Sequence, residues 1–318
     1  MKPINVLVTG VGAIIGYGII RSLRLSKIKT KVIGMDTDPK AIGFKFSDNY
    51  LVGPRADATN YITSIIEIYK KYKIDLVIPG IPQDVIALSQ NRYLLPKSLK
   101  VVLNTREALR LEQDKWETYK FLHRKDLPTP PTLLGEFLSS KDLSKLKYPQ
   151  LLKLRNSFAG KGMYLVNNPK EAKFYLEKNP SYIIQEVVGK DSEEYTCGLF
   201  GFPDGSTTDI IIMKRVLSYG STFKAEVGKF PLVRKVVIQL TKSLKILGPT
   251  NIQIRVQNKI PYIIEINARV SSSSSLRTLF GFNEPELCIR SFFLKEQNIV
   301  VKIKSGYANR YIEDFLWK

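Results

Sequence analysis

The chain has 318 residues, 44% of them hydrophobic, and its 49 lysines and arginines against 29 acidic residues give a formal net charge of +20. This apolar content excludes a disordered chain, and no apolar run is long enough to predict a membrane span. Two cysteines and one histidine exclude a disulfide framework or a Cys/His zinc site and fit a cytoplasmic protein. The basic residues are scattered and accompany no nucleic-acid motif, so neither nucleic acid nor a membrane is an expected partner.

The first hundred residues alternate between expected strands and expected helices. Strands at 4–9, 31–36, 75–79 and 101–103 are separated by helices at 17–25, 60–72 and 83–90, which predicts a doubly wound parallel sheet. Gly10, Gly12 and Gly16 form the pattern GxGxxxG after the first strand, as in a Rossmann unit. Such glycines bind a dinucleotide or let the helix pack closely on the strand. We favour packing and keep NAD binding as an alternative.

A helix is expected at 116–124, followed by a proline-rich run at 127–131 that neither a helix nor a central strand can cross. Beyond it, a strand carrying Lys153 leads into a loop with Gly160, Lys161 and Gly162, and a second strand begins at Met163. The glycines let backbone N–H groups approach an anion, and the lysine adds positive charge. No helix follows, so this is not a Walker A loop. The pattern predicts a hairpin lid over phosphates, with an ordinary surface hairpin as the alternative.

Strands are next expected at 182–188, 195–200 and 208–215, followed by a helix at 231–248. The segment 251–276 then predicts an antiparallel hairpin and a run of five serines at 271–275. A further helix is expected at 284–295, and closing strands are expected at 299–303 and 309–315.

The hairpin at 251–276 carries polar side chains on one face of apolar strands. Glu265 and Asn267 lie two residues apart on the second strand, and Gln253 lies on the first. Their oxygens are the ligands that Mg²⁺ prefers. Arg269 follows on the same face, where a guanidinium would hold the anion of a phosphoryl-transfer reaction. The alternative is a buried polar strand end followed by a low-complexity serine loop.

The order Asn-Ile-Gln at 251–253 and Glu-Ile-Asn-Ala-Arg-Val-Ser at 265–271 resembles the metal-binding segment of the ATP-grasp superfamily. The resemblance is to the branch of the carbamoyl phosphate synthase large subunit. It implies an α/β protein with a Rossmann-like preceding domain at 1–108 and an ATP-grasp domain at 109–318. The latter would comprise two α+β subdomains, a lid at about 128–188 and a metal-binding subdomain at about 189–318.

The resemblance also implies a role for each matching residue. Lys115 and Lys153 match lysines that reach the nucleotide phosphates, and the 160–162 loop matches the glycine-rich flap. The matching metal ligands are Gln253, Glu265 and Asn267. The remaining matches are Glu186 and Val188 at the adenine hinge, Glu194 at the ribose hydroxyls, Lys214 and Arg215 near a basic phosphate contact, and Arg269 at the acyl phosphate.

The function implied is an ATP-dependent ligase that joins a carboxylate to an amine, or a similar nucleophile, through an acyl phosphate. ADP and phosphate are released, and the cofactors are ATP and two Mg²⁺ or Mn²⁺ ions. A small-molecule acid and an amine are the expected partners, and a second copy of the chain is a further candidate. Three alternatives remain: an ATP-grasp kinase that stops at the phosphorylated product, a nicotinamide oxidoreductase, and a nucleotide-binding protein without ligase activity.

Overall fold

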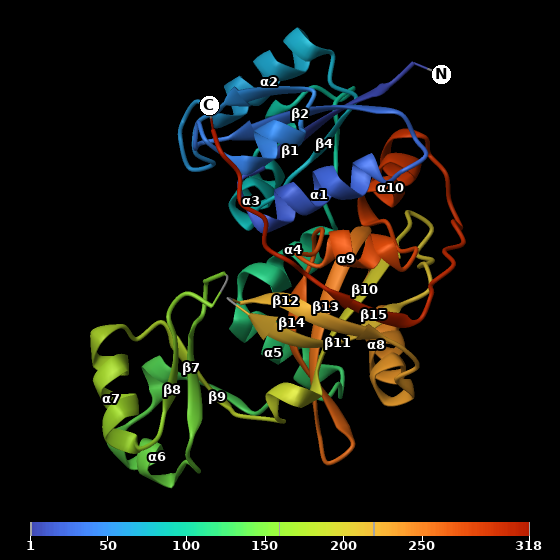
Figure 1. Cartoon of the computed structure of the whole chain (residues 1–318). Helices are drawn as coiled ribbons and strands as arrows, with labels where there is room; N and C mark the ends of the chain where they lie inside the picture. The colour runs from blue at the N-terminus through green and yellow to red at the C-terminus, as the bar shows by residue number, and fades with distance from the viewer. Residues whose placement is uncertain (1, 159, 219, 318) are drawn as a thin grey trace.

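A computed structural model describes residues 2–158, 160–218 and 220–317. Three sheets organise these residues, of five, six and four strands. The five-stranded sheet lies at one end of the molecule, the six-stranded sheet lies below it, and the four-stranded sheet forms a separate lobe at the side (Figure 1). Among the described residues, no helix combines the length and the apolar character needed to cross a bilayer.

The N-terminal sheet is entirely parallel, with the strand order β3-β2-β1-β4-β5. Its strands are β1 (Ile4–Thr9), β2 (Thr30–Asp36), β3 (Asn49–Val52), β4 (Leu76–Ile78) and β5 (Lys100–Val101), and its helices are α1 (Ile14–Arg24), α2 (Tyr61–Tyr72) and α3 (Pro82–Gln90). Apolar clusters cover both faces of the sheet, as expected for parallel strands. The predicted doubly wound fold is confirmed.

The glycines of the first loop are explained by close packing. A Cβ on Gly16 would lie 2.2 Å from the carbonyl oxygen of Gly10, and a Cβ on Gly80 would lie 2.1 Å from that of Thr9. Gly10 itself has a φ of +60°, a conformation that glycine adopts without a steric penalty. The helix and the loop after β4 can therefore approach the end of β1 only because these positions lack side chains.

Two helices link this sheet to the rest of the chain. They are α4 (Arg106–Gln113) and α5 (Lys115–Arg124), separated by the N-cap residue Asp114, whose carboxylate accepts hydrogen bonds from the first backbone amides of α5. The helix expected at 116–124 begins one residue earlier, with Lys115 as the first residue of α5. The predicted domain boundary at residue 108 falls within α4 and stays a prediction.

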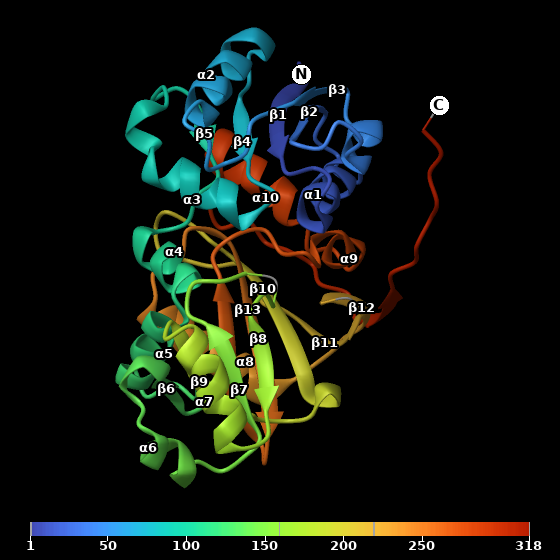
Figure 2. The ribbon, with the colours of Figure 1, turned by 90° about the vertical axis from the view of Figure 1, so that its left-hand side faces the viewer.

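The lobe at the side is an antiparallel sheet with the order β6-β9-β7-β8. It contains β6 (Thr132–Leu134), β7 (Gln150–Leu154), β8 (Met163–Val166) and β9 (Tyr182–Glu186), with helices α6 (Ser140–Lys145) and α7 (Pro169–Lys178) on its outer face. Leu152, Val166 and Ile184 pack beneath these helices. The opposite face of the sheet lies toward the central sheet (Figures 1 and 2).

The central sheet has the order β14-β13-β10-β11-β12-β15. Its strands are β10 (Glu194–Gly201), β11 (Ile211–Ser218), β12 (Ser221–Val227), β13 (Gly248–Gln257), β14 (Ile260–Asn267) and β15 (Gly306–Asn309). Helix α8 (Pro231–Ser243) packs with α4 and α5 on its apolar face. The β13–β14 turn consists of Asn258 and Lys259, both with positive φ, which is the two-residue turn that matches the twist of a hairpin.

The chain after β14 returns to the N-terminal sheet. Helices α9 (Ser274–Leu279) and α10 (Glu284–Cys288) pack against α1, and a π-helical turn, Ile289–Phe293, follows. One apolar cluster thus joins Val6 of β1 and Ile19 of α1 to Met213 of the central sheet and Leu287 of α10. The two regions share a core.

The C-terminal expectations were wrong in detail. Neither 299–303 nor 309–315 is an independent strand: the closing strand is β15, which pairs with β12. Ile299 is buried in the shared core without a partner strand, so its apolar pattern reflects packing and not sheet pairing. The helix expected at 284–295 is shorter and changes to the π-helical turn, the helix expected at 231–248 ends at Ser243, and the last two serines of the run begin α9.

Candidate active site

The β13–β14 hairpin brings the three predicted metal ligands to one edge of the central sheet. Gln253 and Glu265 are directly paired across the two strands, and Asn267 is paired with Asn251 two residues further on. Residues two apart on a strand share a face, so all three side chains leave the sheet on the same side. The sequence pattern predicted this arrangement correctly because it depends only on strand period and turn length.

The side-chain chemistry of this cluster fits a hard cation. The Glu265 carboxylate makes no hydrogen bond or ion pair with the described residues, and the Nδ2 of Asn267 is buried without a partner. The two amide oxygens already face positive charge: Gln253 Oε1 accepts from Arg215 Nη2 at 3.0 Å, and Asn267 Oδ1 accepts from Arg269 Nη2 at 2.8 Å. Within the described residues no group of three His, Cys, Asp or Glu side chains could hold a metal ion.

Two lysines converge on Glu265 from different elements. Lys115 at the start of α5 and Lys153 on β7 line one cavity together with Glu265, between the lid sheet and the edge of the central sheet. Lys153 donates to Gln185 Oε1 at 2.7 Å, and Lys115 donates to the carbonyl oxygen of Ser157 at 2.6 Å. Burial lowers the pKa of both ammonium groups, that of Lys153 to about 8, while Glu265 opposes the shift. A ligand of high negative charge would stabilise the protonated forms of both lysines, so the cavity favours such a ligand.

The pKa of Lys153 leads to a prediction about nucleotide affinity. Phosphate oxygens favour the charged ammonium, so binding requires protonated Lys153 and becomes weaker as the pH rises above the pKa of about 8 in the free protein. We expect the affinity for Mg²⁺ and a non-hydrolysable ATP analogue to fall by up to about tenfold per pH unit above pH 8, measured by calorimetry. The Lys153→Arg variant, whose guanidinium stays charged, should show a much shallower slope. Equal slopes in both proteins would assign the titration to another group.

The predicted phosphate loop joins β7 to β8 as a hairpin. Gly160 and Gly162 have positive φ, the backbone conformation for which glycine is suited, and Lys161 is exposed. Ala159 in this loop lies outside the described residues. The base of the loop is held by Arg155, which pairs with Asp114 at 2.8 Å, and by Asn156, which donates to the carbonyl oxygen of Gln113 at 2.9 Å. The lid is thus attached to the α4–α5 junction beside Lys115.

Because Lys115 holds the carbonyl of Ser157, a nucleotide phosphate would compete with this loop for the same ammonium. We expect the amides of the 160–162 loop to exchange hydrogen rapidly without nucleotide and to become protected with Mg²⁺ and ATP, as in loops that close over substrates. Hydrogen exchange read by mass spectrometry, with a β1 peptide as the internal control, measures this. Exchange and proteolysis near Lys161 that are unchanged by saturating nucleotide would contradict the lid assignment.

The predicted hinge residues follow β9. The backbone N–H of Glu186 donates to the carbonyl oxygen of Pro131 at 2.9 Å, which attaches the end of β9 to the start of β6, and the Glu186 side chain is exposed. Val188 is buried, and Gly189 donates to Gln257 Oε1 at 2.6 Å, which ties this segment to the β13–β14 turn. The segment therefore connects the lid to the central sheet. Adenine binding at its backbone stays a prediction.

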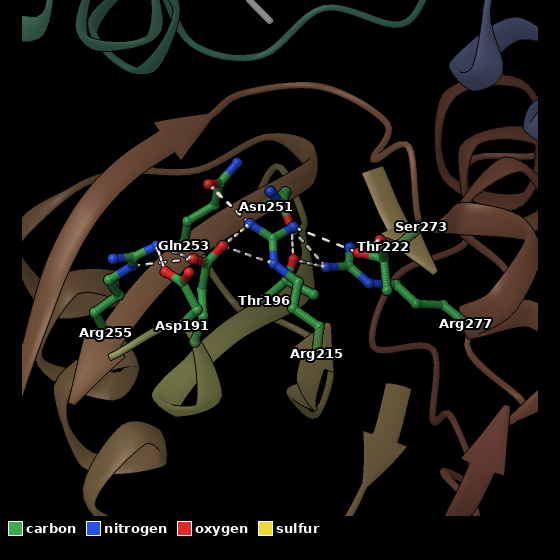
Figure 3. A network of polar contacts seen from close by, with 10 residues as sticks. Asp191, Thr196, Arg215, Thr222, Asn251, Gln253, Arg255, Ser273 and Arg277 are labelled. Carbon is green, nitrogen blue, oxygen red and sulfur yellow. Dashed lines mark hydrogen bonds and ion pairs between the residues drawn. The ribbon is translucent and has the colours of Figure 1, made fainter. Parts of the chain in front are cut away.

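Glu194, predicted to accept the ribose hydroxyls, is a buried carboxylate that pairs with Arg215 and Arg255, two arginines of the polar network in Figure 3. Its side chain is 4% exposed, and its two oxygens pair with different guanidiniums, Arg215 at 2.6 Å and Arg255 at 2.7 Å. A ribose would have to share or displace these partners. The contact to ribose stays a prediction, and the structure shows Glu194 as the anchor of two arginines.

The two neighbouring basic residues in the middle of β11, Lys214 and Arg215, have different partners. Arg215 is buried and reaches Glu194 and Gln253, whereas Lys214 pairs with Glu193 at 2.6 Å and stands over the ring of Tyr195. Adjacent strand residues point to opposite faces, so only one of them can reach the oxygen cluster. The structure does not bring Lys214 to this site. The alternation of a strand predicts that only one of the two can reach the cluster, and the pairing of β11 with β10 selects Arg215.

Several charged residues within the site or in the core beneath it were not predicted. Arg255 shares a strand face with Gln253, which was a usable signal. Glu112 on α4, and the buried pair Arg277 and Glu284, come from segments with no distinguishing local pattern. Arg277 donates to Thr196 and Asn251 beneath the cluster, as Figure 3 shows for these three residues.

Comparison with known proteins identifies this arrangement. Residues 112–273, just over half of the chain, match the family described as ATP-grasp domain, and residues 6–98 match the PylC-like N-terminal domain. The chain belongs to the ATP-grasp family. The ATP-grasp match ends just beyond the ligand hairpin, and the PylC-like match covers most of the parallel sheet.

Curated relatives of this ATP-grasp chain carry the name carbamoyl phosphate synthase large chain, as the sequence resemblance implied. The protein from Clostridium botulinum (strain Alaska E43) is 25% identical over 300 residues, which cover 84% of this chain and 27% of that protein. The protein from Thermotoga maritima is 23% identical over 202 residues, or 57% of this chain and 18% of that protein. The chain thus spans about a quarter or less of the length of these relatives.

Solved structures agree with the ATP-grasp fold. N5-carboxyaminoimidazole synthetase from Staphylococcus aureus in complex with ADP superposes with a TM-score of 0.75 at 16% identity, over 96% of this chain and 82% of that one. Biotin carboxylase from Campylobacter jejuni gives a TM-score of 0.73 at 16% identity, over 96% and 74%. The predicted order of a Rossmann-like domain followed by an ATP-grasp fold is confirmed.

Proposed function

We propose that this ATP-grasp protein is an ADP-forming ligase that joins a small-molecule carboxylate to an amine. The observation that carries the proposal is the meeting of Lys115, Lys153 and Glu265 in one cavity between the lid and the ligand hairpin. Two lysines with lowered pKa values, and a carboxylate that forms no ion pair with the described residues, fit nucleotide phosphates and a bound cation. The named relatives and structural neighbours, which include ligases and carboxylases, support this class of reaction.

The residues divide the work of the proposed reaction. Lys115, Lys153 and the 160–162 loop bind and orient the phosphates of ATP, with adenine at the 186–188 hinge. The oxygens of Gln253, Glu265 and Asn267 would hold one or two Mg²⁺ ions, which when bound neutralise the phosphates and polarise the transferred group. Arg269 lies next to these ligands and stabilises the anionic acid and its acyl phosphate. Arg215 donates a hydrogen bond to Gln253 Oε1 and so keeps this side chain oriented.

The bond changes balance without a nucleophilic side chain. A carboxylate oxygen of the substrate attacks the terminal phosphorus of ATP, the bond to the bridging oxygen breaks, and ADP leaves. The amine then attacks the acyl carbon, forms the C–N bond, and releases phosphate and a proton. The protein contributes orientation and fixed positive charge. The buried, free cysteines, Cys197 and Cys288, fit the cytoplasm as the location.

A screen for ADP release with paired acids and amines tests the proposal. We expect ADP to appear only when a suitable acid is present and the condensed product to require the amine as well. A stable phosphorylated acid with no condensed product would make the protein a kinase. No acid-dependent ADP release across a broad panel, from protein that binds ATP, would contradict ligation and favour the nucleotide-binding alternative.

A further inference from the structure

Glu112, near the end of α4, is a buried carboxylate to which no step of the proposed reaction assigns a role. Its side chain is 4% exposed and stands at the wall of the cavity that contains Lys115 and Glu265. Burial raises the pKa of this carboxyl, while Arg269 and the backbone amide of Ala268 act in the opposite direction. A charge in such a place is costly unless its partners compensate it.

Both oxygens of Glu112 hold the segment that directly follows the metal-ligand strand. Oε1 lies 2.7 Å from the Nε of Arg269, and Oε2 accepts a hydrogen bond from the backbone N–H of Ala268 at 3.0 Å. The other end of the guanidinium reaches Asn267 Oδ1 and the carbonyl oxygen of Val270. One carboxylate from α4 thus fixes the direction of Arg269 and the backbone next to Asn267.

The ion pair is a charge contact and not an aligned hydrogen bond. Neither Glu112 Oε1 nor Arg269 Nε has a hydrogen-bond partner with good geometry, although the two atoms are close and buried. Because the guanidinium is planar and rigid, this contact at Nε restrains the orientation of the whole group. Its Nη2 donates to Asn267 Oδ1, so the same contact holds the guanidinium beside the proposed metal ligands.

We infer that Glu112 is a positioning residue that aims the guanidinium of Arg269 at the acyl phosphate, an inference that rests on the proposed function. A buried ion pair is weak evidence for a role in stability, because desolvation offsets much of its attraction. Glu112 lies beside the proposed metal-ligand strand and the two phosphate lysines, so we assign it a role in orienting Arg269 and not one in stability. Glu112 connects the α4–α5 junction, which carries Lys115, to the arginine at the acyl centre.

The test uses inorganic phosphate as the probe, because phosphate is the product anion that Arg269 would hold beside Mg·ADP. Calorimetry measures the Kd of Mg·ADP and then the Kd of phosphate for the Mg·ADP complex, in four proteins: wild type, Glu112→Gln, Arg269→Lys and the double variant. A neutral glutamine keeps the shape of Glu112 but loses the charge that restrains Arg269. We expect phosphate binding to weaken about tenfold in Glu112→Gln, with Mg·ADP affinity within about threefold of wild type.

The double variant separates positioning from general stability. Lysine has no planar fork to aim, so Glu112→Gln should cost less than about twofold further once Arg269 is lysine. Additive losses would overturn the inference, as would equal weakening of Mg·ADP and phosphate. Glu284→Gln is the matched control, since Glu284 likewise pairs with a buried arginine and accepts from a backbone amide. It should lower the thermal midpoint at least as much without a selective loss of phosphate affinity.

Phosphate binding also distinguishes the two levels of the proposal. Wild-type protein that binds Mg·ADP but no phosphate would contradict the acyl-phosphate site, and with it both the proposed function and the role of Glu112. Wild-type protein that binds phosphate as tightly as Glu112→Gln would overturn only the role of Glu112. With an active acid from the screen, the KM for that acid should rise in Glu112→Gln while the KM for ATP stays within about threefold.

Discussion

We expect the Glu265→Gln variant to lose ATP turnover by about a thousandfold or more while keeping its fold. Glu265 supplies the only formal negative charge among the three proposed ligands, and glutamine would leave a neutral set with much lower affinity for Mg²⁺. Loss of several kcal/mol of metal-derived stabilisation in the transition state corresponds to roughly three powers of ten in rate. ADP release and Mn²⁺ binding, followed by its paramagnetic effect on water relaxation, measure the two effects.

The stability of this variant provides its own check. The Glu265 carboxylate makes no hydrogen bond or ion pair with the described residues, so the thermal midpoint should stay within about 2 °C of wild type. Glu107→Gln, on the exposed face of α4, is a control of the same chemistry remote from the cluster. Near-native turnover in Glu265→Gln would contradict the assignment of Glu265 as a metal ligand.

For Arg269→Lys we expect a different division of effects. Turnover with the carboxylic acid should fall by about a hundredfold or more, as when one preorganised donor to a developing charge is removed. Lysine keeps the charge but cannot hold a planar or tetrahedral anion with two parallel hydrogen bonds. Affinity for Mg·ATP should remain within about threefold, because the lost contacts belong to the acid and its transition state. Steady-state kinetics together with nucleotide binding separate the two quantities.

Each other outcome for Arg269→Lys has a definite meaning. Equal losses of nucleotide binding and turnover would place the guanidinium on the nucleotide. Unchanged turnover would make Arg269 a structural residue that neutralises Glu112. The Lys153→Arg variant is a useful comparison, because its effect should fall on nucleotide binding and its pH dependence.

The sequence predicted those parts of the site that depend on local geometry. Strand period and a two-residue turn place Gln253 opposite Glu265, and glycines with positive φ mark the lid loop. Contacts between distant segments were beyond such reasoning. The pairs Glu194–Arg215 and Glu112–Arg269 join residues 21 and 157 positions apart, and no local pattern specifies which buried charge meets which.

The C-terminal segment shows that an apolar run alone does not decide between a strand and another buried conformation. An apolar run such as 299–303 fits a strand or a segment packed into a core, and only the identity of its neighbours decides. Here the strand that closes the sheet is β15, and the apolar residues before it complete the shared core. The ligand hairpin needed no such distant information, since both of its strands are adjacent in the chain.

The shared core also has a consequence for synthesis on the ribosome. Val6 of β1 and Ile19 of α1 share an apolar cluster with Leu287 and its neighbours in α10, which are translated much later. A nascent chain that has emerged only as far as β5 therefore exposes apolar surface for the time needed to translate nearly 190 more residues (from 101 to 287). We expect arrested nascent chains to bind holding chaperones until α10 emerges, and the Leu287→Asp variant to extend that dependence after release.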